Sequence, residues 1–178
     1  LDGEAYRVRS RADDAAGNAQ DVVSEEGFRY DASAPAGRFT IGAEDPAYTR
    51  SRDVFLFSQV SDAVEMRVAH GAARGSFGPW EPYATEYAWQ LAPGDGAKVV
   101  RAQYRDTVWN VLEVSDDIML DQTAPVSACH LPTVVGPQAW SGHISGTAVD
   151  ASSGVASVTI TIQRLSDAAF WNGTQWDA

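Results

Sequence analysis

Residues 95–110 read Asp-Gly-Ala-Lys-Val-Val-Arg-Ala-Gln-Tyr-Arg-Asp-Thr-Val-Trp-Asn. Apolar and polar side chains alternate before the second aspartate, which is typical of a half-buried β-strand that ends in a turn. A second copy of this text begins at Asp2-Gly3, alternates through residues 6–12 and ends at Asp14-Ala15-Ala16-Gly17-Asn18. The chain therefore contains a repeated β unit.

A second repeated motif gives the spacing of the repeat unit. The sequence Asp-x-x-Ala-Pro occurs at residues 31–35 and again at residues 121–125, so the copies lie 90 residues apart. This is a normal length for one β-sandwich domain. We expect the C-terminal part of a domain in residues 1–34, a complete domain in residues 35–123 and the N-terminal part of a further domain in residues 124–178.

The expected fold class is all-β. No segment of useful length places apolar residues at helical spacing, whereas period-2 alternation and β-branched or aromatic runs recur throughout. The complete domain is expected to contain strands near residues 38–41, 54–60, 64–70, 80–83, 87–91, 98–105 and 117–120. About seven short strands in this length predict an immunoglobulin-like or fibronectin-type-III-like sandwich. The chain then holds immunoglobulin-like β-sandwiches in tandem, one complete domain flanked by two partial ones.

The two flanking segments carry strand patterns of their own. Strands are expected at residues 5–12 and 27–30 in the first segment, and at residues 142–149 and 155–164 in the last. Residues 170–176 are expected to form a hairpin, because Asn172-Gly173 favours the positive φ angles of a type I′ turn.

Three groups of residues resemble parts of the tandem bacterial immunoglobulin-like repeats of large secreted and cell-surface proteins. The residues that carry this resemblance are 14–18 with 31–35, 60–68 with 80–84, and 144–158. In such repeats the position of Gly17 is usually glycine, whereas the second copy has Trp109. We therefore expect the turn that follows Asp106 to be built differently from the turn that follows Asp14.

The composition limits the partners of the chain. Its net charge is −11, from 24 acidic and 13 basic residues, so no attraction to nucleic acid is expected. No stretch approaches the ~20 apolar residues of a membrane span, so no membrane insertion is expected in this segment. The single cysteine, Cys129, rules out an internal disulfide framework and is expected to pack as a small apolar residue.

Aspartates at turns and domain junctions offer candidate metal ligands. Oxygen ligands for Ca²⁺ could converge there, and the calcium candidates are Asp14, Asp31, Asp106 and Asp121. The alternative is that these side chains cap their own turns through Asx hydrogen bonds. The sequence favours the alternative, because it contains no Asp-x-Asp-x-Asp-Gly calcium loop. No catalytic motif is present, so no enzyme activity and no resident cofactor other than calcium are expected.

Aromatic side chains at two expected hairpins raise the question of sugar binding. An exposed ring can stack on a pyranose, and the candidates for such a glycan platform are Trp80, Tyr83, Trp171 and Trp176. In a small sandwich, aromatic residues more often pack inside the domain.

The resemblance implies a non-enzymatic structural segment of an extracellular or cell-surface protein, such as a stalk, fibre or filament. The alternative is an adhesin or carbohydrate-binding module of a secreted protein. The expected partners are adjacent repeats or neighbouring copies of the same protein, and glycans for the alternative function. Residues 124–178 of one copy and residues 1–34 of the next together total 89 residues, about one domain. Two arrangements stay open: these residues are one section of a longer tandem array, or identical chains join head to tail by supplying strands to each other.

Overall fold

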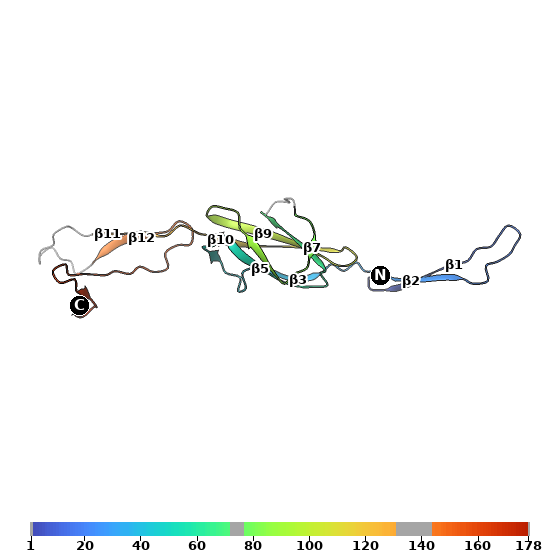
Figure 1. The fold of residues 1–178 in the computed structure, drawn as a ribbon, viewed down its shortest axis with the longest axis horizontal. Coiled ribbons are helices and arrows are strands. Elements are labelled where there is room, and N and C mark those ends of the chain that lie inside the picture. The colour runs from blue at the N-terminus through green and yellow to red at the C-terminus, as the bar shows by residue number, and fades with distance from the viewer. Residues whose placement is uncertain (1, 72–76, 131–143, 178) are drawn as a thin grey trace. The chain divides into compact units, whose positions relative to one another are not determined.

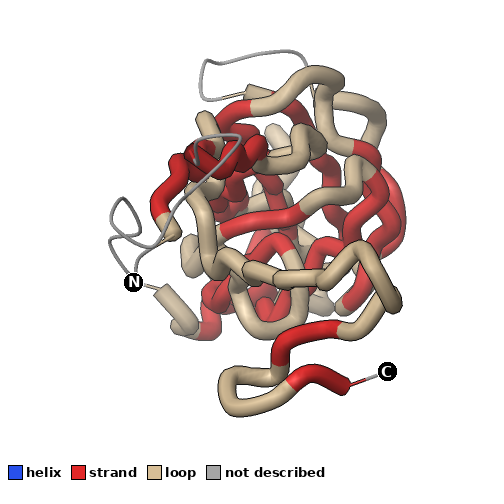
Figure 2. The backbone as a smooth tube through the Cα atoms, turned by 90° about the vertical axis from the view of Figure 1, so that its left-hand side faces the viewer, coloured by secondary structure: helices blue, strands red, loops and turns tan. Residues whose placement is uncertain are grey.

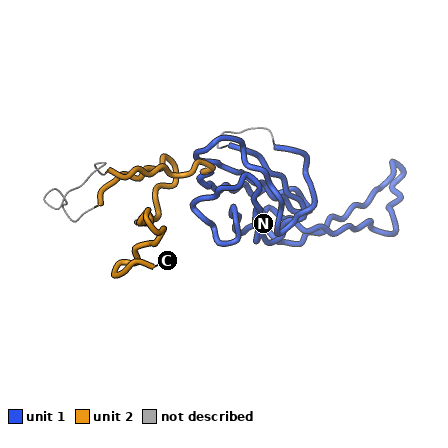
Figure 3. Tube along the Cα trace, turned by 60° about the vertical axis from the view of Figure 1, so that its left-hand side comes forward, with its two compact units in different colours: residues 1–120 blue, residues 121–178 orange. Residues whose placement is uncertain are grey.

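The computed structural model describes residues 2–71, 77–130 and 144–177. Strands and loops make up these residues, and none of them is helical (Figure 2). Consequently no helix in the described part of the chain is long and apolar enough to cross a membrane. The chain divides into two compact units, residues 1–120 and 121–178 (Figure 3).

Residues 36–120 of the first unit form two sheets (Figure 1). One sheet has the strand order β4-β10-β9-β6-β7, and the other has the order β3-β5-β8. Neighbouring strands are antiparallel, except that β4 pairs with β10 in parallel. The strands of the five-stranded sheet are β4 (Tyr48–Thr49), β6 (Glu65–His70), β7 (Glu81–Pro82), β9 (Gly96–Arg105) and β10 (Val111–Leu120). Those of the three-stranded sheet are β3 (Ala36–Ile41), β5 (Asp53–Ser61) and β8 (Glu86–Gln90).

Both sheets contribute alternate side chains to a single hydrophobic core, as the period of two along a strand requires. From β9 the core receives Val100, Ala102 and Tyr104, all fully buried, whereas Arg101 and Arg105 belong to the opposite face. The other buried members of the core are Phe39, Ile41, Leu56, Val60, Met66, Leu91 and Ile118. Full burial of each large apolar side chain contributes about 1.5–3 kcal/mol, so this core is the main source of stability in the first unit.

The strands expected in residues 35–123 are present, with three differences. The strand expected at residues 80–83 is shortened to Glu81–Pro82, and the short strand β4 was not predicted. Strand β10 begins at Val111, six residues before the expected position. Acidic residues obscure the alternation in its first half, where Glu113 is stabilised from β9 by an ion pair with Arg101 and a hydrogen bond from Gln103.

The first unit also contains a two-stranded hairpin, formed by β1 (Ala5–Ser10) and β2 (Ser24–Arg29). The ring of Tyr6 stacks on that of Phe28 at a centroid distance of 5.2 Å, because these residues are directly opposite in the antiparallel register. Nearly every residue of both strands is exposed. The hairpin therefore has an apolar face that no described residue covers.

The second unit has two separate strand pairs, β11 (Val126–His130) with β12 (Ser145–Val149), and β13 (Phe170–Trp171) with β14 (Trp176–Asp177). The strand expected at residues 142–149 is β12, and residues 142–143 lie outside the described part of the chain. The strand expected at residues 155–164 is not formed, and this prediction is wrong. Its pattern of Val158, Ile160 and Ile162 is that of a strand, but no described strand pairs with residues 155–161. Contact with β13 is limited to the end of the segment, where the carbonyl of Ile162 accepts from the N–H of Trp171 and Gln163 forms a bridge with Phe170.

The expected hairpin at residues 170–176 is present, but its turn is not of type I′. Such a turn needs positive φ at both central residues, and only Gly173 has one, at 103°. The Asn172 side chain shapes the turn instead, because its Oδ1 accepts hydrogen bonds from the backbone N–H groups of Thr174 and Gln175. Hydrogen bonds to the Asn172 side chain therefore stabilise this turn, rather than the type I′ backbone conformation that the sequence predicted.

Candidate functional site

The turn between β9 and β10 is organised by one carboxylate, that of Asp106. Its Oδ1 accepts hydrogen bonds from the backbone N–H of Val108 and of Asn110, both at 2.9 Å. Its Oδ2 accepts a third from the side-chain amide of Asn110, also at 2.9 Å. Burial opposes ionisation of this carboxyl, but the hydrogen bonds outweigh burial and lower its pKa. Asp106 is therefore an ionised cap of its own turn.

The turn that follows Asp14 has the same construction. Oδ1 of Asp14 accepts from the backbone N–H of Ala16 and Asn18, and Oδ2 accepts from the Asn18 amide at 2.7 Å. The side-chain amide of Asn18, followed by its backbone N–H, lowers the pKa of Asp14. The backbone N–H of Gly17 in one turn and of Trp109 in the other donates to the carbonyl of the capping aspartate. The expectation that the two turns differ is wrong.

The shared turn places Trp109 in a backbone conformation that tryptophan rarely adopts. Its φ is 73°, close to the 89° of Gly17, and its side chain is 73% exposed. A non-glycine residue in the left-handed region costs roughly 1–3 kcal/mol. The hydrogen bonds to Asp106 impose this conformation, because they fix the backbone on both sides of Trp109.

The other two calcium candidates also accept hydrogen bonds from nearby backbone. Asp31 caps the N–H of Ser33 at 3.0 Å. Asp121 accepts from the N–H of Thr123 at 3.1 Å and from both the N–H and the hydroxyl of Ser153, the latter at 2.5 Å. The Ser153 hydroxyl is the main cause that lowers the pKa of Asp121.

The calcium candidates do not form a group of metal ligands, although Asp31 and Asp106 both accept hydrogen bonds from the side-chain amide of Asn110. In residues 2–71, 77–130 and 144–177, no group of three or more His, Cys, Asp or Glu side chains lies close enough to hold a metal ion. Three of the four, Asp14, Asp106 and Asp121, have most of their acceptor capacity used by hydrogen bonds within the chain. The arrangement is that of turn caps.

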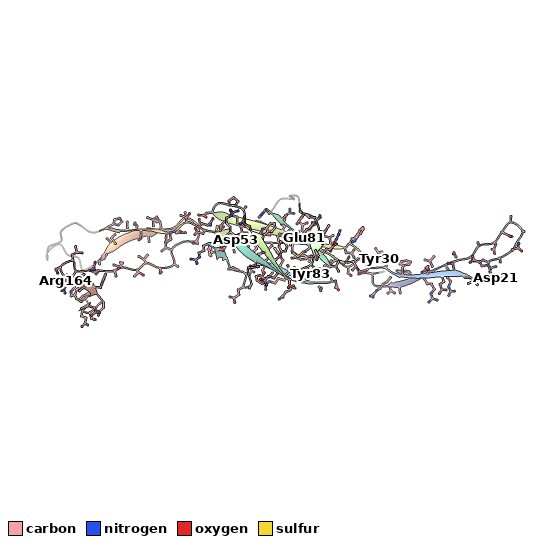
Figure 4. The ribbon with its side chains drawn as sticks, viewed as in Figure 1. Asp21, Tyr30, Asp53, Glu81, Tyr83 and Arg164 are labelled. Atoms are coloured by element: carbon pink, nitrogen blue, oxygen red, sulfur yellow. The ribbon has the colours of Figure 1, made fainter. Side chains whose placement is uncertain are left out.

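Tyr83, one of the four glycan candidates, packs on the core of the first unit (Figure 4). Its ring meets the ring of Tyr104 edge to face, at a centroid distance of 6.0 Å. Its hydroxyl donates to the carbonyl of Ser58 at 3.1 Å and accepts from the N–H of Val60 at 3.0 Å. Tyr83 thus ties the segment after β7 to strand β5.

Trp80 takes part in a stack of arginine and aromatic side chains that the sequence did not reveal. The guanidinium carbons of Arg67 and Arg105 lie 4.3 and 4.4 Å from its ring centroid. The series continues at both ends, because Arg67 also lies over Phe77 and Arg105 also lies over Trp109. Arg67 lies on β6 and Arg105 on the neighbouring strand β9, so their approach to one ring depends on the pairing of these strands and could not be recognised in the local sequence.

The last two glycan candidates form an exposed aromatic pair in the second unit. Trp171 and Trp176 are opposite each other in the β13–β14 hairpin, with ring centroids 5.4 Å apart. Both are more than one third exposed, and the guanidinium of Arg164, labelled in Figure 4, lies 4.9 Å from the Trp176 ring. An exposed ring pair beside a cation can stack on a planar or sugar ligand.

An open pocket of about 290 Å³ lies in the first unit, beside strands β6 and β8. Its lining includes the rings of His70 and Trp89, whose centroids are 4.5 Å apart and whose planes are tilted by 42°, and the hydrogen-bonded pair Tyr87 and Glu81. Burial, assisted by the hydrogen bond to Glu81, raises the pKa of Tyr87. The buried Nε1 of Trp89 has no hydrogen-bond partner among the described residues. Sequence reasoning missed this pocket because its lining comes from three separate segments.

A groove of about 220 Å³ lies in the second unit, between the β11–β12 pair and residues 158–160. Its lining includes the thiol-bearing residue Cys129 together with Ala148, Val158 and Ile160. Cys129 was expected to be packed, and it is exposed. The prediction failed because the groove that this side chain faces is not filled by any described residue.

Comparison with known proteins adds no family to these observations. Neither a protein-family model nor a curated protein matches the chain.

Proposed function

We propose that the chain is a non-enzymatic structural segment of an extracellular repeat protein, built from tandem immunoglobulin-like β-sandwiches. One observation carries the proposal: residues 36–120 place a five-stranded and a three-stranded sheet around one core, and the Asp-capped turn of this region recurs near the start of the chain. A domain with its own hydrophobic core, bounded on both sides by the same Asp-x-x-Ala-Pro motif, is typical of a repeat in a stalk, fibre or filament.

In this function the segment acts mechanically. Asp31 and Asp121 mark the segments that connect successive repeats, and each is followed by a proline that keeps the preceding residue extended. The first connection is also tied to the domain that follows it, because the side-chain amide of Asn110 donates to the backbone carbonyl of Asp31 at 3.3 Å. Such ties restrict the swing between neighbouring repeats.

The proposal is tested by locating the protein on its source cells. Antibodies raised against the chain should label the surface of intact cells, with gold particles on projecting stalks or filaments in electron micrographs. A cytoplasmic protein serves as the control and should be labelled only after permeabilisation. If the chain behaves like that control, the proposed function is wrong.

A carbohydrate-binding module of a secreted protein is the second candidate, favoured by the exposed Trp171–Trp176 pair. A glycan array should then show saturable binding that Trp171→Ala abolishes. Trp80→Ala is the matched control, because Arg67 and Arg105 already stack on that ring. Absence of binding, or equal loss in both variants, would remove this candidate.

A further inference from the structure

The pocket of about 290 Å³ beside β6 and β8 lies within the first unit, and residues of both sheets line it. We propose that this pocket binds one ring of a neutral sugar. The inference goes beyond the proposed structural function and does not depend on it. The pocket shares no residue with the exposed Trp171–Trp176 pair, so it is a separate candidate site.

The pocket opens where the pairing between β6 and β7 stops. The N–H of Tyr83 donates to the carbonyl of Val64, and two residues further along the register Met66 is opposite Glu81. Hydrogen-bonded pairs alternate along an antiparallel ladder, so the next one would join Val68 to Pro79. Proline has no backbone N–H to donate, and the ladder ends before it. Val68 and Pro79 therefore line a pocket instead of continuing the sheet.

Three rings form one wall of this pocket. The ring of Trp89 contacts that of His70, and its centroid lies 6.3 Å from that of Tyr87. Tyr87 and Trp89 occupy alternate positions of β8, whereas His70 ends β6, so the wall joins the two sheets. Aromatic rings present flat apolar faces, against which the C–H groups of a sugar ring can pack.

Exposed hydrogen-bonding groups accompany the rings. The carboxylate of Glu81, labelled in Figure 4, accepts from the Tyr87 hydroxyl at 3.1 Å, and its oxygens have capacity for further donors. The imidazole of His70 is exposed, and within the described residues it contacts Trp89 and makes no hydrogen bond. Each hydroxyl of a sugar is both donor and acceptor, so one ring can donate to Glu81 and also bond to His70.

The charges of the lining favour a neutral ligand. Among the described residues that line the pocket, Arg67 is the cation and Glu81 is the anion. The guanidinium of Arg67 already stacks on Trp80 and donates to Gln103 at 2.8 Å. An anionic ligand would be repelled by Glu81, and a cationic ligand by Arg67. A neutral sugar avoids both repulsions and keeps the hydrogen bonds.

The volume of the pocket suits a single sugar ring, because about 290 Å³ is near the lower end of the range for ligand pockets. A small ligand in an open pocket makes few contacts, so we expect weak binding, with a Kd on the order of 1 mM.

NMR titration of the full chain with neutral sugars tests the proposal. The probes are glucose, galactose, mannose and N-acetylglucosamine, each raised to about 100 mM. The reporter is the indole N–H of Trp89, which is buried without a hydrogen-bond partner among the described residues and senses contacts at its ring. Trp89→Phe identifies its signal among those of the six tryptophans. At least one sugar should shift this signal saturably.

Two variants test the assigned groups. His70→Ala should weaken binding about tenfold and Glu81→Gln at least about threefold, through loss of a ring contact and of a charged acceptor. Both side chains are exposed, so the fold should tolerate these changes. Tyr48→Ala is the matched control, because Tyr48 is an exposed aromatic residue of β4, at the opposite end of the same sheet. It should bind as wild type does.

Charged and apolar probes complete the test. Choline, glucuronate and benzyl alcohol at the same concentrations should shift the Trp89 signal far less than the bound sugar does. No shift with any of the four sugars, an equal shift with a charged or apolar probe, or unchanged binding by His70→Ala would each overturn the proposal. Sugar-induced shifts confined to other tryptophans would also overturn it, because they would place binding elsewhere. Cell-surface labelling tests the structural function separately, so either proposal can fail alone.

Discussion

Replacing Asp106 by alanine should separate the turn-cap interpretation of the aspartates from the calcium interpretation. The substitution removes three hydrogen bonds, two from backbone N–H groups and one from the amide of Asn110. Each hydrogen bond contributes about 1 kcal/mol, so the loss of all three should lower the free energy of unfolding of residues 36–120 by about 3 kcal/mol. For a region of this size, the change lowers Tm by roughly 12–24 °C.

The assay is thermal unfolding followed by tryptophan fluorescence, with and without Ca²⁺ or a chelator. Asp14→Ala is the matched control, because it removes the same three bonds from the turn of the exposed hairpin and should leave the central transition in place. Neither Ca²⁺ nor the chelator should move the wild-type Tm. A chelator that lowers Tm, or an Asp106→Ala variant as stable as wild type, would refute the turn-cap reasoning.

The same carboxylate predicts a dependence on acid. Hydrogen bonds hold the pKa of Asp106 below its ordinary value of 3.8 against the opposing effect of burial. Its contribution is therefore complete above about pH 4 and is lost as the pH falls through the lowered pKa. Asp106→Asn should flatten the acid side of the stability profile, and a profile identical to wild type would contradict this assignment.

Three further predictions concern buried or strained residues of the first unit. Burial raises the pKa of Tyr104 to about 12, so stability should fall by about 2 kcal/mol as the pH rises from 10 to 12, and Tyr104→Phe should remove this slope in alkaline denaturation curves. The Tyr104 hydroxyl and Ser58 Oγ form a buried hydrogen bond at 2.6 Å. Each single variant, Tyr104→Phe or Ser58→Ala, should therefore lower the free energy of unfolding in urea by about 1–3 kcal/mol. The double variant should lower it by less than the sum of the two. At Trp109, glycine should be about 1 kcal/mol more stable than alanine, because only glycine relieves the left-handed backbone; equal stability of the two variants would show that the turn carries no strain.

Much of the strand pattern could be predicted from the sequence because it depends on local alternation. The apolar residues of β9 occupy every second position, and the structure buries them as that spacing requires. The turn residues Asp14 and Asp106 could likewise be recognised, because an aspartate binds backbone within its own loop.

Features that depend on a partner elsewhere in the chain could not be predicted. The early start of β10 depends on Arg101 and Gln103 of the neighbouring strand, which stabilise Glu113. Tyr83 packs on the core because its hydroxyl reaches backbone groups of β5, more than 20 residues away. The ring of Trp80, which both Arg67 and Arg105 contact, also comes from a separate segment of the chain.

By itself, the sequence determined that this protein is all-β, where most of its strands lie, and which turns repeat. The tertiary structure decided which apolar faces are covered and which strand-like segment forms no strand: Val100 and Ile118 are buried in a core, Val8 of β1 and Phe28 of β2 remain exposed, and residues 155–162 are exposed and form no strand. The physical reason is that alternation in sequence sets only which side chains can share a face. A strand forms when another backbone segment supplies its hydrogen bonds, and the sequence of one segment does not identify that partner.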